Sequence, residues 1–476
     1  MINSPKIQKA SLILSVCINI SLQFGFAQAQ IHTQIESECN SSNGQSPFWF
    51  TNNRQGISTL KNENDYLKAG LFREMNDTSK FDYQLGLDIV EAQNYPSSFF
   101  IQQLYGDIRY KKFIFSLGSK ERWGILKNPE LSSGGLSWSG NARPIPQARL
   151  ETNGYLSYPW LLNNQLKVNA ALSYGIFSDY QFIKRTAGSS INNVFYHNKT
   201  LILQYDIPQT QWSTSIGLES HSQFGGYRKD LKQFLLITIQ AQGDSKSSKE
   251  DKLYMIGSSR GSWHIMPTYH TNNYNLSVYL ENFFEDFSGM AKQNRLDGIW
   301  GLEYKRTDKK QGISGIVLEY LQTTDQSGPV NWVIHDHPGT QLLAESPKGN
   351  DGYYKSEFNG IWAHWGMING NPLLTSSIYN NYSTVVFNNR VKAFHFGISA
   401  LFNKEWSTKI ISTYTRGWGT YDKPFNDITN DYMSLVELHY TPLKLKNWRL
   451  TIAGALDRGD LYGNNTGISL KLRYRR

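Results

Sequence analysis

The sequence is poor in most of the features that define other classes of protein. Of its 476 residues only two are cysteine and 15 are proline, and only 18% are charged. A helical membrane protein needs repeated apolar runs of about 20 residues, and the only candidate for one lies at the start of the chain. The aromatic content of 14% is too high, and the charge too low, for a disordered chain. What remains is a large folded protein rich in aromatic residues and glycine.

Residues 1–29 have the pattern of a secretory signal peptide. Two lysines precede an apolar stretch, and Ala27-Gln28-Ala29 has the small residues of a cleavage site. An uncleaved membrane anchor and a lipoprotein at Cys17 are the alternatives. Cleavage would leave Cys39 as the one cysteine, so no intrachain disulfide could form, and a net charge of +7. We therefore expect an exported protein that is stabilised by burial or by a membrane.

Strict alternation of apolar and polar residues dominates the chain after about residue 80. Successive side chains of a strand point to opposite sides, so each such segment has one apolar and one polar face. The pattern predicts roughly sixteen to eighteen strands. Segments of this kind include 81–89, 99–110, 112–119, 150–158, 166–176, 194–206, 212–218, 232–241, 274–284, 298–306, 312–323, 391–402, 405–416, 433–441, 448–454 and 468–474.

Two architectures bury one face of so many strands. A secreted soluble sandwich turns the apolar faces inward, whereas a membrane barrel turns them to lipid and keeps the polar faces inside. Charged residues mixed with Gly and Ser on the polar faces, and aromatic residues near strand ends, favour the barrel. The chain also ends in a strand, Gly467 to Tyr474, that is typical of the signal read by the outer-membrane assembly machinery. We predict one all-β domain, an antiparallel transmembrane barrel formed by residues 66–476.

Three regions interrupt the strand pattern. Residues 30–65 are polar apart from Phe48-Trp49-Phe50, and we interpret them as a small N-terminal periplasmic element. Residues 120–149 and 324–390 are long loops, which in compact proteins are usually functional or disordered. Their content of Trp, Tyr and His argues against disorder. We expect them to plug or cover the lumen.

Several motifs in these regions resemble the capsule-assembly Wzi family, in the branch from Bacteroidetes-type bacteria. The motifs are Ser46-Pro47-Phe48-Trp49, the run from Leu131 through Ser139-Gly140-Asn141-Ala142-Arg143-Pro144-Ile145-Pro146-Gln147, His337-Pro338-Gly339 and Asn350-Asp351-Gly352-Tyr353-Tyr354. The resemblance implies an 18-stranded outer-membrane barrel with a small helical periplasmic element and with loops that fill or cover the lumen. It also implies a lectin-like role, in which the protein binds exported capsular polysaccharide and attaches it to the cell surface.

Binding sites for sugars combine aromatic faces with a few planar polar groups, and arginine can grip carboxylates of acidic sugars. The two long loops supply such residues. Our candidates for polysaccharide binding are Trp138, Asn141, Arg143, Trp332, His335, Asp351, Tyr353, Trp362, His364 and Trp365.

Structural roles compete with binding at each of these positions. The tryptophans could pack the loops against one another, and the glycines and prolines of 134–146 could shape a rigid turn or a constriction. Arg143 could pair with Glu121 or Glu130 instead of a sugar. The His335-Asp336-His337 group is weak evidence for a metal, so we expect no metal and no cofactor.

The sequence has no Gly-x-Ser-x-Gly elbow between a strand and a helix and no phosphate-binding loop ending in Gly-Lys-Ser/Thr, which disfavours catalysis. The export signal disfavours nucleic acid as a partner. We expect a monomer that contacts polysaccharide, outer-membrane lipid and lipopolysaccharide, and the barrel-assembly machinery during biogenesis. The competing hypothesis is an outer-membrane porin or small-solute transporter. An anchor should have a plugged lumen, whereas a transporter needs a path through it.

Overall fold

The computed structural model describes residues 31–76, 79–226, 230–241, 256–285, 287–308, 310–326 and 351–476. The predicted signal peptide lies outside these residues. Among the described residues, no helix is both long and apolar enough to cross a bilayer.

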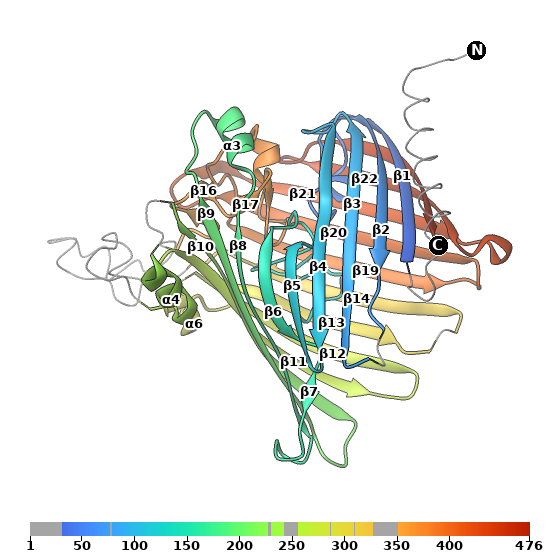
Figure 1. The fold of residues 1–476 in the computed structure, drawn as a ribbon. Helices are drawn as coiled ribbons and strands as arrows, with labels where there is room; N and C mark the ends of the chain where they lie inside the picture. Colours follow the sequence, from blue (N-terminus) through green and yellow to red (C-terminus); the bar gives the residue numbers. More distant parts are fainter. Residues whose placement is uncertain are drawn as a thin grey trace.

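Nineteen strands of the described residues form a single antiparallel sheet that closes on itself (Figure 1). Apart from β6, which pairs with β8 and not with β7, each strand of the sheet pairs with the next one along the chain. The last strand pairs with the first, as in Cys39 opposite Leu470. β6 and β7 both pair with β8 and together form one interrupted strand of the barrel, so the barrel wall has 18 strands. The predicted all-β barrel of about 18 strands is therefore confirmed.

The strands begin and end as follows. The first half of the barrel comprises β1 (Ile31–Asn43), β2 (Glu63–Arg73), β3 (Phe81–Gln93), β4 (Phe99–Tyr110), β5 (Phe113–Ser119), β6 (Gln147–Thr152), β7 (Leu156–Ser157), β8 (Leu166–Ile176), β9 (Val194–Asp206) and β10 (Trp212–Gly225). The second half comprises β11 (Ser258–His270), β12 (Tyr274–Phe284), β13 (Gly298–Arg306), β14 (Gly312–Gln322), β19 (Val391–Leu401), β20 (Trp406–Gly419), β21 (Pro424–Tyr440), β22 (Trp448–Gly459) and β23 (Asn465–Arg475).

The connections differ in length at the two ends of the barrel. The first residue of β1, Ile31, and the last residue of β23, Arg475, lie at the end where the connections are short turns. The long loops and the helices α3 (Tyr180–Ala187), α4 (Leu231–Ile239) and α6 (Phe287–Met290) lie at the other end (Figure 1). Outer-membrane barrels have short periplasmic turns and longer extracellular loops, so we call these the periplasmic and extracellular ends.

The faces of the strands have the polarity of a membrane barrel. On β23, Ile468 is 66% exposed and Leu470 is 52% exposed, whereas the intervening Ser469 is buried. On β3, Leu85 and Leu87 are exposed and Asp88 is buried. Apolar side chains therefore face outward and polar side chains face the lumen along the same strand, which is the arrangement that lipid requires.

Two sequence-based assignments are wrong. Residues 30–65 are not a periplasmic element, because 31–43 form the first strand of the barrel and 44–62 form a loop at the extracellular end. The predicted strand 232–241 is the helix α4, which the Asp230 carboxylate caps by accepting a hydrogen bond from the Gln233 N–H at 2.9 Å. The apolar run there is continuous rather than alternating, and the capping aspartate selects the helix.

Candidate functional site

Three loop segments enter the lumen and pack there into one body, which we call the plug. They are residues 44–62, with the short helix α2 (Phe48–Thr51), residues 120–146, and residues 351–390. The last segment holds two small hairpins, β15 (Lys355–Ser356) with β16 (Gly360–Ile361) and β17 (Ala363–His364) with β18 (Met367–Ile368), and the 3-10 helix η2 (Ser377–Asn380). Buried side chains of all three segments share a core with the inner wall, among them Phe48, Trp49, Leu136, Trp138, Tyr353, Trp362 and Leu373.

Carboxylates on the inner wall hold the middle segment. Glu281 on β12 accepts a hydrogen bond from the Leu136 N–H at 2.7 Å, and its other oxygen lies 3.1 Å from the ammonium of Lys127. Glu319 on β14 accepts hydrogen bonds from the Ser133 N–H at 2.8 Å and the Ser132 hydroxyl at 2.6 Å. These buried charges are compensated by plug groups, which makes the contact specific in position.

Two glycines let the middle segment follow its tight path. Gly134 has a φ of +110°, which other residues rarely adopt. A Cβ at Gly140 would lie 2.0 Å from the ring of Trp123. The expectation of a rigid turn in this run agrees with this geometry.

Asn141 joins the three plug segments. Its amide nitrogen donates to the Ile368 carbonyl oxygen at 2.9 Å and to the Ser376 hydroxyl at 3.3 Å, and its oxygen accepts from the Asn53 N–H at 3.1 Å. The side chain is fully buried. The plug is therefore one hydrogen-bonded unit rather than three independent loops.

Arg143 is held by aromatic rings. Its guanidinium lies 4.4 Å from the ring centre of Phe100 and 4.3 Å from that of Trp365, and no carboxylate of the described residues lies within ion-pair distance of it. Burial lowers the pKa of Arg143 to about 10, against the opposing charge of Asp179. Burial likewise raises the pKa of Asp179 to about 6, although this carboxylate accepts a hydrogen bond from the Trp365 N–H.

The plug buries most of the residues predicted to bind polysaccharide. Trp138, Asn141, Arg143, Tyr353, Trp362 and His364 are all buried, whereas Asp351 and Trp365 are partly exposed. Trp332 and His335 lie outside the described residues. Burial lowers the pKa of His364 to about 3, so its imidazole is neutral at pH 7. In this arrangement the buried side chains offer no surface to a polymer, and sugar contact stays a prediction for the whole set.

One buried group has the residue types of a metal site. Ligand atoms of Glu219, His264 and Glu281 lie within 4.8 Å of one another. His264 Nε2 lies 3.1 Å from Glu219, and the Lys127 ammonium lies beside Glu281. The Lys127 ammonium thus supplies the positive charge that a metal ion would otherwise bring. We therefore interpret these residues as an ion-pair cluster that anchors the plug.

A polar cavity lies below the plug, and we call it the vestibule. It has a volume of about 450 Å³ and is lined by plug residues above and by the inner faces of β1, β2, β20, β21 and β23. Its walls carry charges of both signs, including the ion pairs Lys409–Glu437 at 2.8 Å and Lys68–Glu36 at 3.7 Å.

A second cavity, the outer cleft, lies at the extracellular end. It has a volume of about 410 Å³ and lies between plug residues 355–386 and the turn 420–423. Lys355 and Asp422 form an ion pair at its edge. Cavities thus lie on both sides of the plug.

Sequence reasoning missed the wall glutamates and the segment 44–62 as parts of the site. Phe48-Trp49-Phe50 stood out as an aromatic group, but it packs at the extracellular end rather than the periplasmic end. Alternation alone places Glu281, Glu303 and Glu319 in the lumen on adjacent strands, which was a usable signal for an anchoring surface.

No family model matches the chain, and no curated protein is similar to it in sequence. Solved structures that resemble it include a BenF-like porin from Pseudomonas fluorescens Pf-5, with a TM-score of 0.48 and 11% identity over 94% of this chain and 99% of that one. Pseudomonas aeruginosa OccK5 (OpdH) has a TM-score of 0.45 and 10% identity, covering 94% and 97% of the two chains. Pseudomonas aeruginosa OprD has 0.44 and 8%, covering 94% and 95%.

These comparisons correct the family expectation. The resemblance to the capsule-assembly Wzi family is wrong, because no family model matches the chain. Of the motifs that suggested it, His337-Pro338-Gly339 lies outside the described residues, whereas Phe48, Trp49, Leu131, Tyr353 and Tyr354 are buried in the plug. With TM-scores below 0.5, the fold itself rests on the strand pairing described above.

Proposed function

We propose that the protein is a gated outer-membrane porin that passes small polar solutes when its plug is displaced. The observation that carries this proposal is the pair of cavities, vestibule and outer cleft, each of which has plug residues in its lining. Loops are the parts of a fold that open at the lowest free energy, whereas the barrel wall is a closed ladder of hydrogen bonds. A path through the lumen can therefore form without any change in the barrel.

The charges in the vestibule support a role with polar solutes. Cations and anions both line its wall and some of them are ion-paired, so a passing solute could exchange hydrogen bonds with water for hydrogen bonds with the wall. We infer a non-catalytic protein that reaches the outer membrane through a cleaved signal peptide. Its expected monomeric state stays a prediction.

A disulfide between plug and wall tests the proposal. The Ser137 hydroxyl in the plug lies 2.5 Å from the Ser262 hydroxyl on β11, so replacing both by cysteine in a Cys39→Ser background should allow a bridge. We expect brief potassium chloride currents from the unmodified barrel in planar bilayers. Oxidation of the Ser137→Cys/Ser262→Cys variant should abolish them, and a reductant should restore them.

A matched control joins two strands of the wall instead. Ser222 on β10 and Ser259 on β11 are register partners whose hydroxyls lie 2.7 Å apart, so Ser222→Cys/Ser259→Cys should form a bridge that leaves the plug free. This variant should conduct equally in both redox states. Currents that persist through the locked plug, or a chain that never conducts with residues 128–143 replaced by a short Gly/Ser linker, would overturn the proposal.

A further inference from the structure

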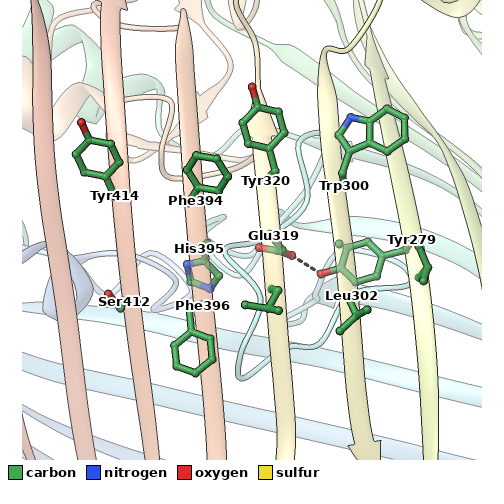
Figure 2. A pocket seen from close by; sticks show the side chains of 13 residues that line it. Tyr279, Trp300, Leu302, Glu319, Tyr320, Phe394, His395, Phe396, Ser412 and Tyr414 are labelled. Atoms are coloured by element: carbon green, nitrogen blue, oxygen red, sulfur yellow. Dashed lines mark hydrogen bonds between the residues drawn. The ribbon is translucent and has the colours of Figure 1, made fainter.

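The outer face of the barrel is hollowed over β12, β13, β14, β19 and β20. The hollow, which we call the lateral groove, has a volume of about 620 Å³. Figure 2 shows two rows of side chains along it: Trp300, Tyr320, Phe394 and Tyr414 in one, and Leu302, Phe396 and Ser412 in the next. Most of these side chains are apolar and point away from the lumen, so the groove opens toward lipid.

The first row marks the edge of the membrane. Its members are direct register partners on four neighbouring strands. Their polar atoms bond toward the extracellular end: the Tyr320 hydroxyl donates to Gln322 at 2.8 Å, and the Tyr414 hydroxyl donates to Asn430 at 2.9 Å. Tyr and Trp side chains sit at the level of lipid headgroups with the ring in the apolar zone and the polar tip in the wet zone. The rest of the groove therefore lies at the depth of acyl chains.

Two cations lie directly outside this row. Lys392 on β19 and Arg416 on β20 are register partners, each two residues beyond a member of the aromatic row and on the same outward face. In the described part of the chain, no carboxylate lies within 4 Å of either side chain. Like charges directly opposite on adjacent strands destabilise a sheet, so a bound anion between them would remove this repulsion.

We propose that the lateral groove and the Lys392–Arg416 pair together bind an acylated, phosphorylated glycolipid of the outer leaflet. The phosphate would lie between the ammonium and the guanidinium, and an acyl chain would fill the groove between Phe396 and Leu302. The proposal depends on the barrel fold and not on conduction through the lumen.

The test counts lipids that stay bound to the purified full-length barrel. Native mass spectrometry is run in non-ionic detergent with bis-phosphorylated lipid A, with the same lipid lacking phosphate, and with inorganic phosphate alone. We expect retention of the phosphorylated lipid, and a weakening of about tenfold or more in Lys392→Gln/Arg416→Gln. Lys444→Gln/Lys446→Gln removes the same charge from an exposed periplasmic turn and should bind as the unmodified chain does.

The acyl part is tested separately. Ser412→Trp should fill the groove and weaken the lipid, whereas Ser434→Trp, on the neighbouring strand outside the groove, should not. Equal retention of the lipid with and without phosphate, or by both double variants, would overturn the proposal. So would full competition by inorganic phosphate together with no effect of Ser412→Trp, since the site would then bind an anion and no lipid. A dimer that forms without lipid and is lost in the same variants would identify a protein contact instead.

Discussion

The Asn141 side chain offers the sharpest test of how the plug is held. Its three hydrogen bonds reach the other two plug segments, and it is fully buried. A buried hydrogen bond contributes about 1 kcal/mol net, so Asn141→Ala should destabilise the closed plug by about 2–3 kcal/mol. That free energy corresponds to a roughly 30- to 150-fold rise in the ratio of open to closed plug.

Asn369 provides a matched control in the same body. It is also fully buried, but neither polar atom of its side chain has a hydrogen-bond partner among the described residues. Asn369→Ala removes the same atoms and leaves no partner unsatisfied, so we expect little change or a small stabilisation of the plug.

Open probability in single-channel recordings measures both variants against the unmodified barrel. Heat modifiability on denaturing gels verifies that the barrel itself remains folded. If Asn141→Ala and Asn369→Ala open equally often, hydrogen bonding through Asn141 does not hold the plug and the reasoning fails. If neither differs from the unmodified chain while both are folded, the plug is held by its apolar core alone.

Three further predictions concern the barrel and the plug. Leu470→Lys, on the lipid face, should lower the free energy of unfolding by about 2–4 kcal/mol in urea titrations in lipid, whereas Leu443→Lys in an exposed periplasmic turn should change it little. Cys39 shares the outward face with Leu470, so a bilayer-soluble maleimide should label it faster than a charged thiol reagent, and the reverse order would place it in the lumen. In the closed state the pKa of Asp179 is about 6, whereas in the open state, with the carboxylate exposed to water, we expect an ordinary pKa near 4. Loss of this proton therefore favours the open state, so open probability should rise as the pH increases from about 4 to 6. Asp179→Asn should reduce that rise.

The alternation of apolar and polar residues predicts the bounds of many strands. β4, β9, β12 and β13 begin and end at the residues that the pattern predicted. β1 escaped notice because its outward face is weakly apolar, with Ser37, Cys39 and Ser41 among its members. A strand with small polar residues on both faces has no period-two signal, and only its pairing with β2 and β23 identifies it.

The plug could not be derived in the same way. Trp138 and Trp362 have the composition expected of a sugar platform, and the same composition serves equally well to fill a lumen. Which of the two holds depends on contacts between residues more than 200 positions apart, such as the Trp362 indole N–H to the Ser137 carbonyl oxygen at 3.2 Å. No local pattern encodes such a contact.

The barrel is predictable from the order of the residues, because side-chain direction in a strand is a local property and lipid on one side demands an apolar residue at every second position. The position of the loops is not predictable in this way, because a loop has no periodic face and its place follows from distant partners such as Glu281 and Glu319. The same loops could cover the lumen or fill it. In this protein, hydrogen bonds to the wall carboxylates and packing in the aromatic core hold the loops inside the lumen.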